Sequence, residues 1–252
     1  MKFPVLQKFK IALHRRTIFG CPKTSAIILA GGIGVRMGEN TPKQYLTLRD
    51  KPVIAHTLIA FQKCSSIRQI VLVAREEDIH YCEAICHQYD IRKCKKVVVG
   101  GATRNESAKC GLKAVDADAE YVAIHDASRC LITPKQIADV CNAAYAYKAA
   151  TAAAPVVDSI KVVNEYGFIE HNVDRATAWC AQTPQIFHHV LYRGAMEKAD
   201  KEGIVVTDDN MLMESLGQRV LVVDCGAENF KITVPSDLQR AEAVLDAREK
   251  NK

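Results

Sequence analysis

The chain has 252 residues, of which 48% are hydrophobic and 25% charged, a composition typical of a globular protein with one or two domains. Its net charge of +5 comes from residues 1–25, which hold six basic residues and no acidic one, leaving 28 basic against 29 acidic residues elsewhere. A nearly neutral body argues against a nucleic-acid partner, and the lack of an apolar run of about 18 residues argues against stable membrane association.

Residues 1–23 form a basic segment without the long apolar run of a secretory signal. We interpret it as a poorly ordered extension of a single domain that covers residues 24–252. An amphipathic membrane-surface or targeting segment is the alternative. The ten cysteines lack the spacing of a disulfide framework, so we expect reduced thiols in a cytoplasmic protein.

A glycine-rich loop at residues 31–38 follows an apolar strand expected at residues 26–30. Glycines let backbone N–H groups approach a bulky anion, and Arg36 and Lys43 add two cations. The dinucleotide fingerprint Gly-x-Gly-x-x-Gly fails because Met37 occupies its third position, and no Walker A sequence follows. The loop therefore predicts binding of a nucleoside triphosphate and disfavours a dehydrogenase.

Strand and helix patterns alternate after this loop. Helices are predicted at 52–63, 76–89, 104–115 and 133–146, and strands at 69–74, 96–99 and 121–124. This alternation is typical of an α/β fold, a mostly parallel sheet with helices on both faces. Ligands in such sheets bind beyond the carboxyl ends of the strands.

The alternation changes at residue 152. Extended residues at 152–163 and up to about 178 flank a turn at 164–167, which predicts an inserted β-hairpin arm at about residues 157–182. Such an arm has little body to pack on, which suggests a partner subunit. Further elements are expected as helices at 188–202, 208–216 (capped by Thr207) and from Pro235 onward, and strands at 219–223 and 230–234.

Three expected strand ends carry residues suited to phosphate or metal. The second of these loops, residues 100–107, again combines glycines with a cation, and the third, residues 125–129, places Asp126 and Arg129 just past a strand. A carboxylate beside a triphosphate normally holds Mg²⁺ or its waters. A lone Asp126 would as often be a helix cap or turn residue, but its convergence with two phosphate-type loops favours a metal-binding role.

Six segments occur in a characteristic order: AGGIGVRMGENTPKQYL, GGATRNES, IHDASR, VDRATAWCAQTPQ, TDD and KITVPSDL. Together they resemble the signatures of the 2-C-methyl-D-erythritol 4-phosphate cytidylyltransferase (IspD) family over about residues 24–247. The resemblance implies a Rossmann-like nucleotidyltransferase fold, a homodimer embraced through the hairpin arm, and dependence on Mg²⁺ or another divalent cation. The implied reaction transfers CMP from CTP to the polyol phosphate 2-C-methyl-D-erythritol 4-phosphate, releasing pyrophosphate, in non-mevalonate isoprenoid synthesis.

The resemblance also implies roles for individual residues. Those implied to be catalytic are Arg36, Lys43, Arg175 and Lys231. Those implied to bind CTP are Ala30, Gly31, Gly32, Gly101 and Ser107. Those implied to bind the second substrate are Asp126, Arg129, Ser159, Arg175, Thr183 and Thr207. Asp126 would also hold the metal, and Ser159 and Arg175 would reach the site from the neighbouring subunit.

Three positions depart from the usual family pattern. Cys130 stands where proline is common, Ser159 replaces threonine, and the first loop begins Ala-Gly-Gly rather than Ala-Ala-Gly. None of these changes removes a group that the chemistry needs. The nucleophile is a phosphate monoester whose second pKa is about 6, so no general base is required. We therefore expect His125, which adjoins Asp126, to be structural.

Three alternative functions compete with this interpretation. A ribitol-5-phosphate cytidylyltransferase shares most motifs, but the segment around Trp179 favours the methylerythritol enzyme. A sugar-1-phosphate nucleotidyltransferase for another base fits the GGATRNES segment less well. A non-catalytic nucleotide-binding protein would be expected to have lost Arg36, Lys43 or Asp126, and all three are present.

Overall fold

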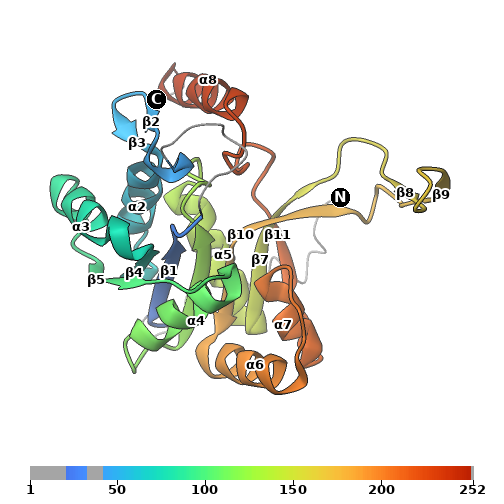
Figure 1. Cartoon of the computed structure of the whole chain (residues 1–252), viewed down its shortest axis with the longest axis horizontal. Coiled ribbons are helices and arrows are strands. Elements are labelled where there is room, and N and C mark those ends of the chain that lie inside the picture. The colour runs from blue at the N-terminus through green and yellow to red at the C-terminus, as the bar shows by residue number, and fades with distance from the viewer. Residues whose placement is uncertain (1–20, 33–41, 251–252) are drawn as a thin grey trace.

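The computed structural model describes residues 21–32 and 42–250 (Figure 1). Most of the predicted basic extension and the part of the glycine-rich loop that contains Arg36 therefore lie outside the described residues. Within these ranges, none of the helices combines the length and hydropathy that a membrane crossing needs.

A seven-stranded sheet forms the centre of the molecule, with strand order β11-β7-β10-β6-β1-β4-β5. Its strands are β1 (Thr24–Leu29), β4 (Ile67–Ala74), β5 (Cys94–Val99), β6 (Tyr121–Asp126), β7 (Ala149–Pro155), β10 (Trp179–His188) and β11 (Leu221–Asp224). All neighbours pair in parallel except β10, which runs antiparallel to both β6 and β7. The predicted α/β fold with a mostly parallel sheet is confirmed.

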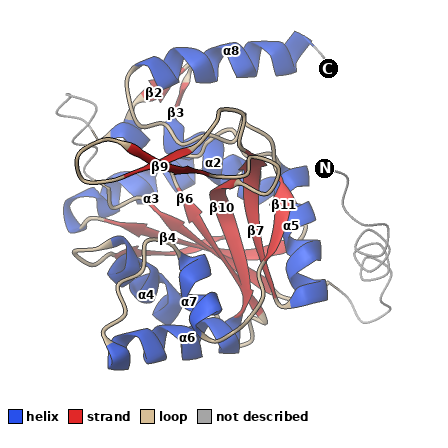
Figure 2. Cartoon of the chain, turned by 90° about the vertical axis from the view of Figure 1, so that its right-hand side faces the viewer, coloured by secondary structure: helices blue, strands red, loops and turns tan. Residues whose placement is uncertain are grey.

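Helices cover both faces of the sheet (Figures 1 and 2). On one face lie α2 (Val53–Lys63), α3 (Ile79–Gln88) and α5 (Pro134–Tyr147), and on the other lie α4 (Arg104–Ala114) and α6 (His189–Glu202), with α7 (Asp209–Ser215) packed on α6. The last helix, α8 (Ser236–Lys250), contacts the small hairpin of β2 (Thr47–Leu48) and β3 (Lys51–Pro52). The described residues also form two 3₁₀ turns, η2 (Lys43–Tyr45) and η3 (Glu76–Asp78).

The apolar runs of the strands supply a core on each face. Successive side chains of a strand point to opposite faces, so Ile27 joins the cluster under α4 and α6 while Ile28 joins the cluster under α2 and α5. Helix α4 lies very close to β1, because a Cβ on Gly111 would be 2.3 Å from the Ile27 Cγ2 atom. This close packing holds α4 against β1, and the helix begins at the edge of the sheet that carries the glycine loops.

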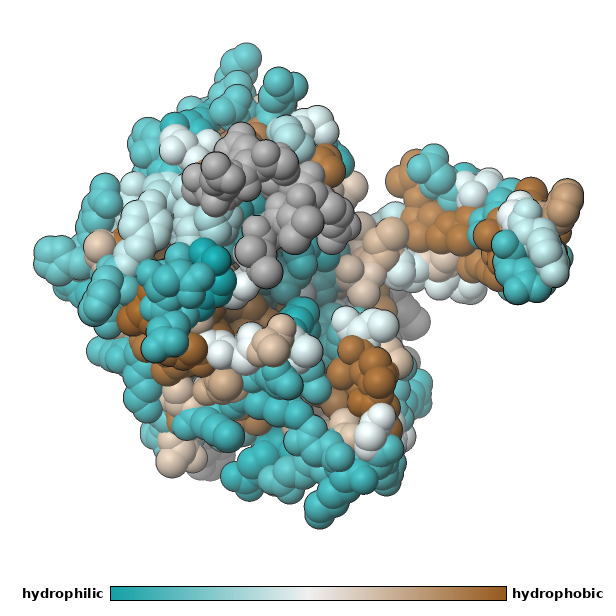
Figure 3. Space-filling model, in the orientation of Figure 1, coloured by the Kyte–Doolittle hydropathy of each residue, from teal (hydrophilic) through white to brown (hydrophobic). Residues whose placement is uncertain are grey.

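The hairpin arm projects from the body (Figures 1 and 3). It holds β8 (Lys161–Val163) and β9 (Ile169–Asn172), paired antiparallel. In the predicted turn, the Asn164 Oδ1 atom accepts from two backbone N–H groups and Gly167 adopts a φ of 83°, which favours glycine. At the base of the arm, Trp179 to Ala181 pair with β7 in the central sheet, so the projecting part is shorter than residues 157–182.

Several predicted elements differ from the structure. Residues 152–155 and 179–188 belong to the central sheet as β7 and β10. Residues 230–234 form no strand, because only Ile232 N donates to a neighbouring segment, at Ser128 O, while Thr233 N and Val234 N donate to the Asp237 carboxylate instead of to a ladder partner. The cap of α7 is Asp208, whose side chain accepts from Met211 N, and Thr207 lies outside the helix. The helix predicted at 76–89 begins as the separate turn η3.

Candidate active site

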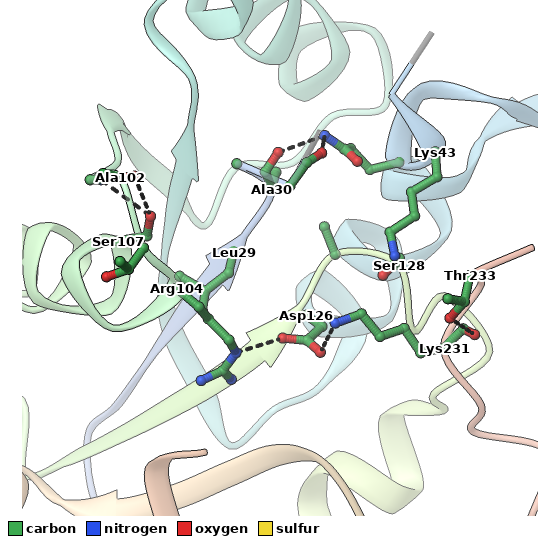
Figure 4. A pocket seen from close by; sticks show the side chains of 16 residues that line it. Leu29, Ala30, Lys43, Ala102, Arg104, Ser107, Asp126, Ser128, Lys231 and Thr233 are labelled. Atoms are coloured by element: carbon green, nitrogen blue, oxygen red, sulfur yellow. Dashed lines mark hydrogen bonds and ion pairs between the residues drawn. The ribbon is translucent and has the colours of Figure 1, made fainter. Parts of the chain in front are cut away.

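A cavity of about 420 Å³ opens at the carboxyl ends of β1 and β6 (Figure 4). Three segments far apart in the sequence line it: the loop after β1 with η2, the loop before α4, and the end of β6. Lys231 and Thr233 close it from the chain after β11. The cavity therefore lies where the parallel strands predict a ligand.

The glycine-rich loop is held at its start by Gln44. The Gln44 side-chain amide donates to the carbonyl oxygens of Ala30 at 2.7 Å and Gly32 at 3.1 Å. Lys43, on η2, is 9% exposed and lines the cavity with Ala30, Gly31 and Gly32. The structure thus brings together every predicted residue of this segment that it describes.

The second loop folds tightly on the first turn of α4. Thr103 caps this helix in a capping box with Glu106. A Cβ on Gly101 would be 2.2 Å from the Glu106 Cβ atom, so only glycine fits there. The Ser107 hydroxyl accepts from Gly101 N and donates to Gly101 O. Ser107 therefore shapes the Gly101 backbone, which lines the cavity.

Asp126, the last residue of β6, lies between three cations. Its carboxylate is 2.9 Å from Lys231 Nζ, 3.2 Å from Arg104 Nε and 3.9 Å from Arg129 Nε. Burial opposes ionisation, but Lys231 and Arg104 outweigh it and hold the pKa of Asp126 well below its usual range. Asp126 is therefore a carboxylate at neutral pH, and Figure 4 shows Lys43, Arg104 and Lys231 directed toward the same space.

His125 points away from this space into the core, where it packs against Phe61. Burial lowers the pKa of His125 to about 3, so the ring is neutral. Its Nε2 atom lies 3.2 Å from the Arg129 carbonyl oxygen, which can only accept, so Nε2 carries the proton and Nδ1 accepts from the Thr183 hydroxyl at 3.0 Å. The Thr183 oxygen in turn accepts from Asp126 N at 3.1 Å.

Thr183 consequently has no hydroxyl proton left to donate to a phosphate oxygen. Its described contacts position Asp126, and its substrate-binding role stays a prediction. His125 holds Thr183 in this orientation, which fits the structural role expected for this histidine.

A second cavity of about 230 Å³ adjoins the first. Both are lined by Arg104, Asp126 and Lys231, and the second adds Arg129, Thr183 and Thr207. The Arg129 Nε atom is buried and has no hydrogen-bond partner among the residues that the structure describes. An unsatisfied guanidinium nitrogen beside a basic cavity is suited to an anionic ligand.

Two predicted site residues lie elsewhere. Ser159 and Arg175 are exposed on the arm, and Arg175 Nη1 donates to Val157 O at 2.9 Å. Neither lines the larger or the smaller cavity. Arg36 lies outside the described residues.

Two residues with a part in the site were missed by the sequence reasoning. Gln44 orders the glycine-rich loop, and Asp209 binds Arg104. Both stand inside segments that pointed to the site, PKQYL and TDD, Gln44 next to Lys43 and Asp209 two positions after Thr207. Their polar side chains, close in sequence to predicted site residues, were the signal that could have identified them.

Comparisons with known proteins agree with this geometry. The family profile described as "2-C-methyl-D-erythritol 4-phosphate cytidylyltransferase" (IspD) matches residues 24–247. Curated proteins of that name from Caldanaerobacter subterraneus and Syntrophus aciditrophicus are each 41% identical, over 222 and 229 residues, or 88% and 90% of this chain and 98% of each relative.

Solved structures give the same result. The crystal structure of 4-diphosphocytidyl-2C-methyl-D-erythritol synthase from Anaerococcus prevotii superposes with a TM-score of 0.80 at 31% identity, covering 89% of this chain and 96% of that one. The structure of 2-C-methyl-D-erythritol 4-phosphate cytidylyltransferase from Thermus thermophilus has a TM-score of 0.71 at 29% identity, covering 88% and 98%.

Proposed function

The chain belongs to the 2-C-methyl-D-erythritol 4-phosphate cytidylyltransferase family, and from this premise we propose that its two connected cavities are the two halves of one active site. The enzyme transfers CMP from CTP to 2-C-methyl-D-erythritol 4-phosphate, giving 4-diphosphocytidyl-2-C-methyl-D-erythritol and pyrophosphate for non-mevalonate isoprenoid synthesis. The observation that carries the proposal is Asp126, an ionised carboxylate among cations at the junction of the cavities.

The larger cavity takes CTP. The Ala30–Gly32 and Gly101 backbones approach the nucleotide, and Lys43 neutralises its phosphates. The smaller cavity takes the polyol phosphate, with the unsatisfied Arg129 Nε atom as a donor to its phosphate. Lys231 lines both cavities, so it lies where the two substrates meet.

The reaction needs no protein base. A dianionic monoester oxygen attacks the α-phosphorus in line, forming the new P–O bond while the bond to the β-phosphate bridging oxygen breaks and pyrophosphate leaves with the electron pair. The neutral, buried His125 is consistent with this scheme, because it faces the core and not the reacting atoms. Catalysis then rests on positioning and on charge stabilisation by Lys43 and Lys231.

The charges of the site leave room for a divalent cation. The described ionic groups around the cavities carry a net charge of only +1, four cations against three carboxylates: Lys43, Arg104, Arg129, Lys231, Asp126, Asp208 and Asp209. A triphosphate and a monoester together carry far more negative charge. Within the described residues no group of three His, Cys, Asp or Glu side chains is arranged to hold a metal ion.

Mg²⁺ is commonly held by one or two carboxylates plus substrate phosphates, so Asp126 with the triphosphate fits it. Bound there, Mg²⁺ would neutralise charge on the triphosphate and help orient the α-phosphoryl group. We expect EDTA to abolish turnover and excess Mg²⁺ to restore it. Full activity in EDTA would contradict this part of the proposal.

The substrate assignment is tested by measuring pyrophosphate release. CTP is paired first with 2-C-methyl-D-erythritol 4-phosphate and then with ribitol 5-phosphate, and ATP, GTP and UTP replace CTP in turn. We expect release only with CTP and the methylerythritol substrate. Faster release with ribitol 5-phosphate would establish the alternative function instead.

The arm supports a homodimer. It exposes four large apolar side chains, Val157, Tyr166, Phe168 and Ile169, each more than 60% exposed. Figure 3 shows hydrophobic surface along the arm. Clustered apolar side chains of this kind mark interaction surfaces. A second copy of the chain would cover them and bring its Ser159 and Arg175 to the smaller cavity.

Mixing two inactive variants tests this arrangement. Lys43→Ala and Arg175→Ala homodimers should both be inactive, while the mixed dimer regains one intact site and part of the activity. No recovery after confirmed subunit exchange would refute shared sites.

We also propose a cytoplasmic location, supported by ten cysteines that all lie in the described residues as free thiols.

A further inference from the structure

Asp209 is a buried carboxylate that lines neither cavity. It is the first residue of α7, two positions after Thr207, and is 2% exposed. Its Oδ2 atom lies 2.6 Å from Arg104 Nη1, and its Oδ1 atom accepts from the hydroxyl of Tyr192. Its backbone N–H donates to Gln185 Oε1 at 3.0 Å. Because Arg104 and Tyr192 each hold one of its oxygens, the Asp209 carboxylate is fixed in one orientation.

Arg104 joins Asp209 to the site. It is the first residue of α4, directly after the glycine loop of the larger cavity, and its Nε atom lies 3.2 Å from Asp126 Oδ1. One guanidinium group therefore bridges two carboxylates, from β6 and α7, as the planar fork of arginine allows. Both carboxylates raise the pKa of Arg104 against the effect of burial, so the bridge is fully charged.

Asp126 has to share its oxygens when substrates enter. In the structure both oxygens are in contact with cations, Oδ1 with Arg104 and Oδ2 with Lys231. A long side chain that lost its contact with Asp126 would be free to turn toward the phosphates, where it would misdirect them. Asp209 prevents this, because it holds the other nitrogen of the same guanidinium group from outside the cavities.

We propose that Asp209 is a positioning residue of the transfer reaction, acting through Arg104 to keep Asp126 in its reactive orientation. The inference rests on the proposed function and extends it to a residue that touches neither substrate. It also ties the start of α7, and so Thr207 in the smaller cavity, to the first turn of α4 at the larger one.

The test is Asp209→Asn, which keeps the shape and the Tyr192 bond but removes the charge that holds Arg104. We expect kcat to fall by about tenfold to a hundredfold, the cost of a misplacement of about 1 Å in an active site. The KM for CTP should stay unchanged or fall, because a negative charge near the triphosphate has been removed. A purely structural defect would lower the folded fraction without this split.

A double-mutant cycle identifies the intermediary. In an Arg104→Gln background, adding Asp209→Asn should change kcat by no more than about twofold, because the contact through which Asp209 acts is already absent. The matched control is Asp200→Asn, which breaks the exposed Lys109–Asp200 ion pair between α4 and α6 and should leave activity unchanged. If Asp209→Asn does not fold, Asp209→Glu replaces it, with a smaller kcat loss expected.

Two results would overturn the inference: an unchanged kcat in Asp209→Asn, with or without a raised KM for CTP, or a full additional loss in the Arg104→Gln background. Wild-type enzyme is assayed alongside. If the wild type releases no pyrophosphate, the proposed function itself fails, which is distinguishable from a working wild type whose Asp209 variant works equally well.

Discussion

Replacing Lys43 with alanine is the most direct test of the larger cavity. Lys43 is 9% exposed on η2, beside the start of the glycine-rich loop, and its side chain is directed into the cavity (Figure 4). A cation and a phosphate oxygen in contact at about 4 Å interact by about 4 kcal/mol at an effective dielectric constant of about 20. Part of this attraction is already present when CTP is bound, so removing Lys43 raises the activation barrier only by the additional attraction that develops in the transition state.

We therefore expect Lys43→Ala to lower kcat by at least about a hundredfold, comparable to the loss of one oxyanion donor. The assay follows pyrophosphate release at saturating CTP and 2-C-methyl-D-erythritol 4-phosphate, with a melting curve to confirm folding. Lys135→Ala is the matched control, since Lys135 is 84% exposed on α5 and paired only with Asp139 among the described carboxylates. Near-normal turnover in folded Lys43→Ala would refute the charge argument.

Three further predictions concern other parts of the molecule. Gly101→Ala places a Cβ 2.2 Å from the Glu106 Cβ atom, so calorimetry should show weaker CTP binding. Denaturant titration should show a stability loss of about 1–3 kcal/mol. Unchanged CTP affinity would contradict the loop's role. Folding lowers the pKa of His125 from its ordinary value of 6.5 to about 3, so between these values only the unfolded chain binds a proton there. The free energy of unfolding should therefore fall by about 2 kcal/mol from pH 8 to pH 5. A flat urea-denaturation profile over this range would argue against a buried neutral ring. Phe168→Asp puts a charge on the apolar arm and should convert a dimer to a monomer in light scattering; an unaltered mass would mean that the arm does not join the subunits.

Sequence patterns predicted the parallel part of the fold because its signals are local. The strands β1, β5 and β6 contain short apolar runs, and the loops after them carry glycines or charged residues that no core would hold. Since parallel strands end at one edge, Lys43, Gly101 and Asp126 could be placed together before the structure was seen. The larger cavity is lined by all three.

The parts that were not predicted depend on contacts between distant segments. Strand β10 contains the sequence AQTPQ, which carries no strand signal, and it is a strand because β6 and β7 leave a gap that it fills. Residues 230–234 have an apolar strand-like sequence, yet Lys231 there is bound to Asp126 and the backbone finds no ladder partner. Of the two adjacent aspartates of TDD, sequence alone does not indicate that Asp209 is the one buried against Arg104.

The position of β10 limits how the gene of such a protein can change in length. Successive residues of a strand face opposite sides, so one codon inserted between Thr183 and Ile186 would either turn Ile186 and Phe187 to the wrong faces or displace Thr183 from Asp126. Insertions and deletions among homologues should accordingly spare the ten residues of β10.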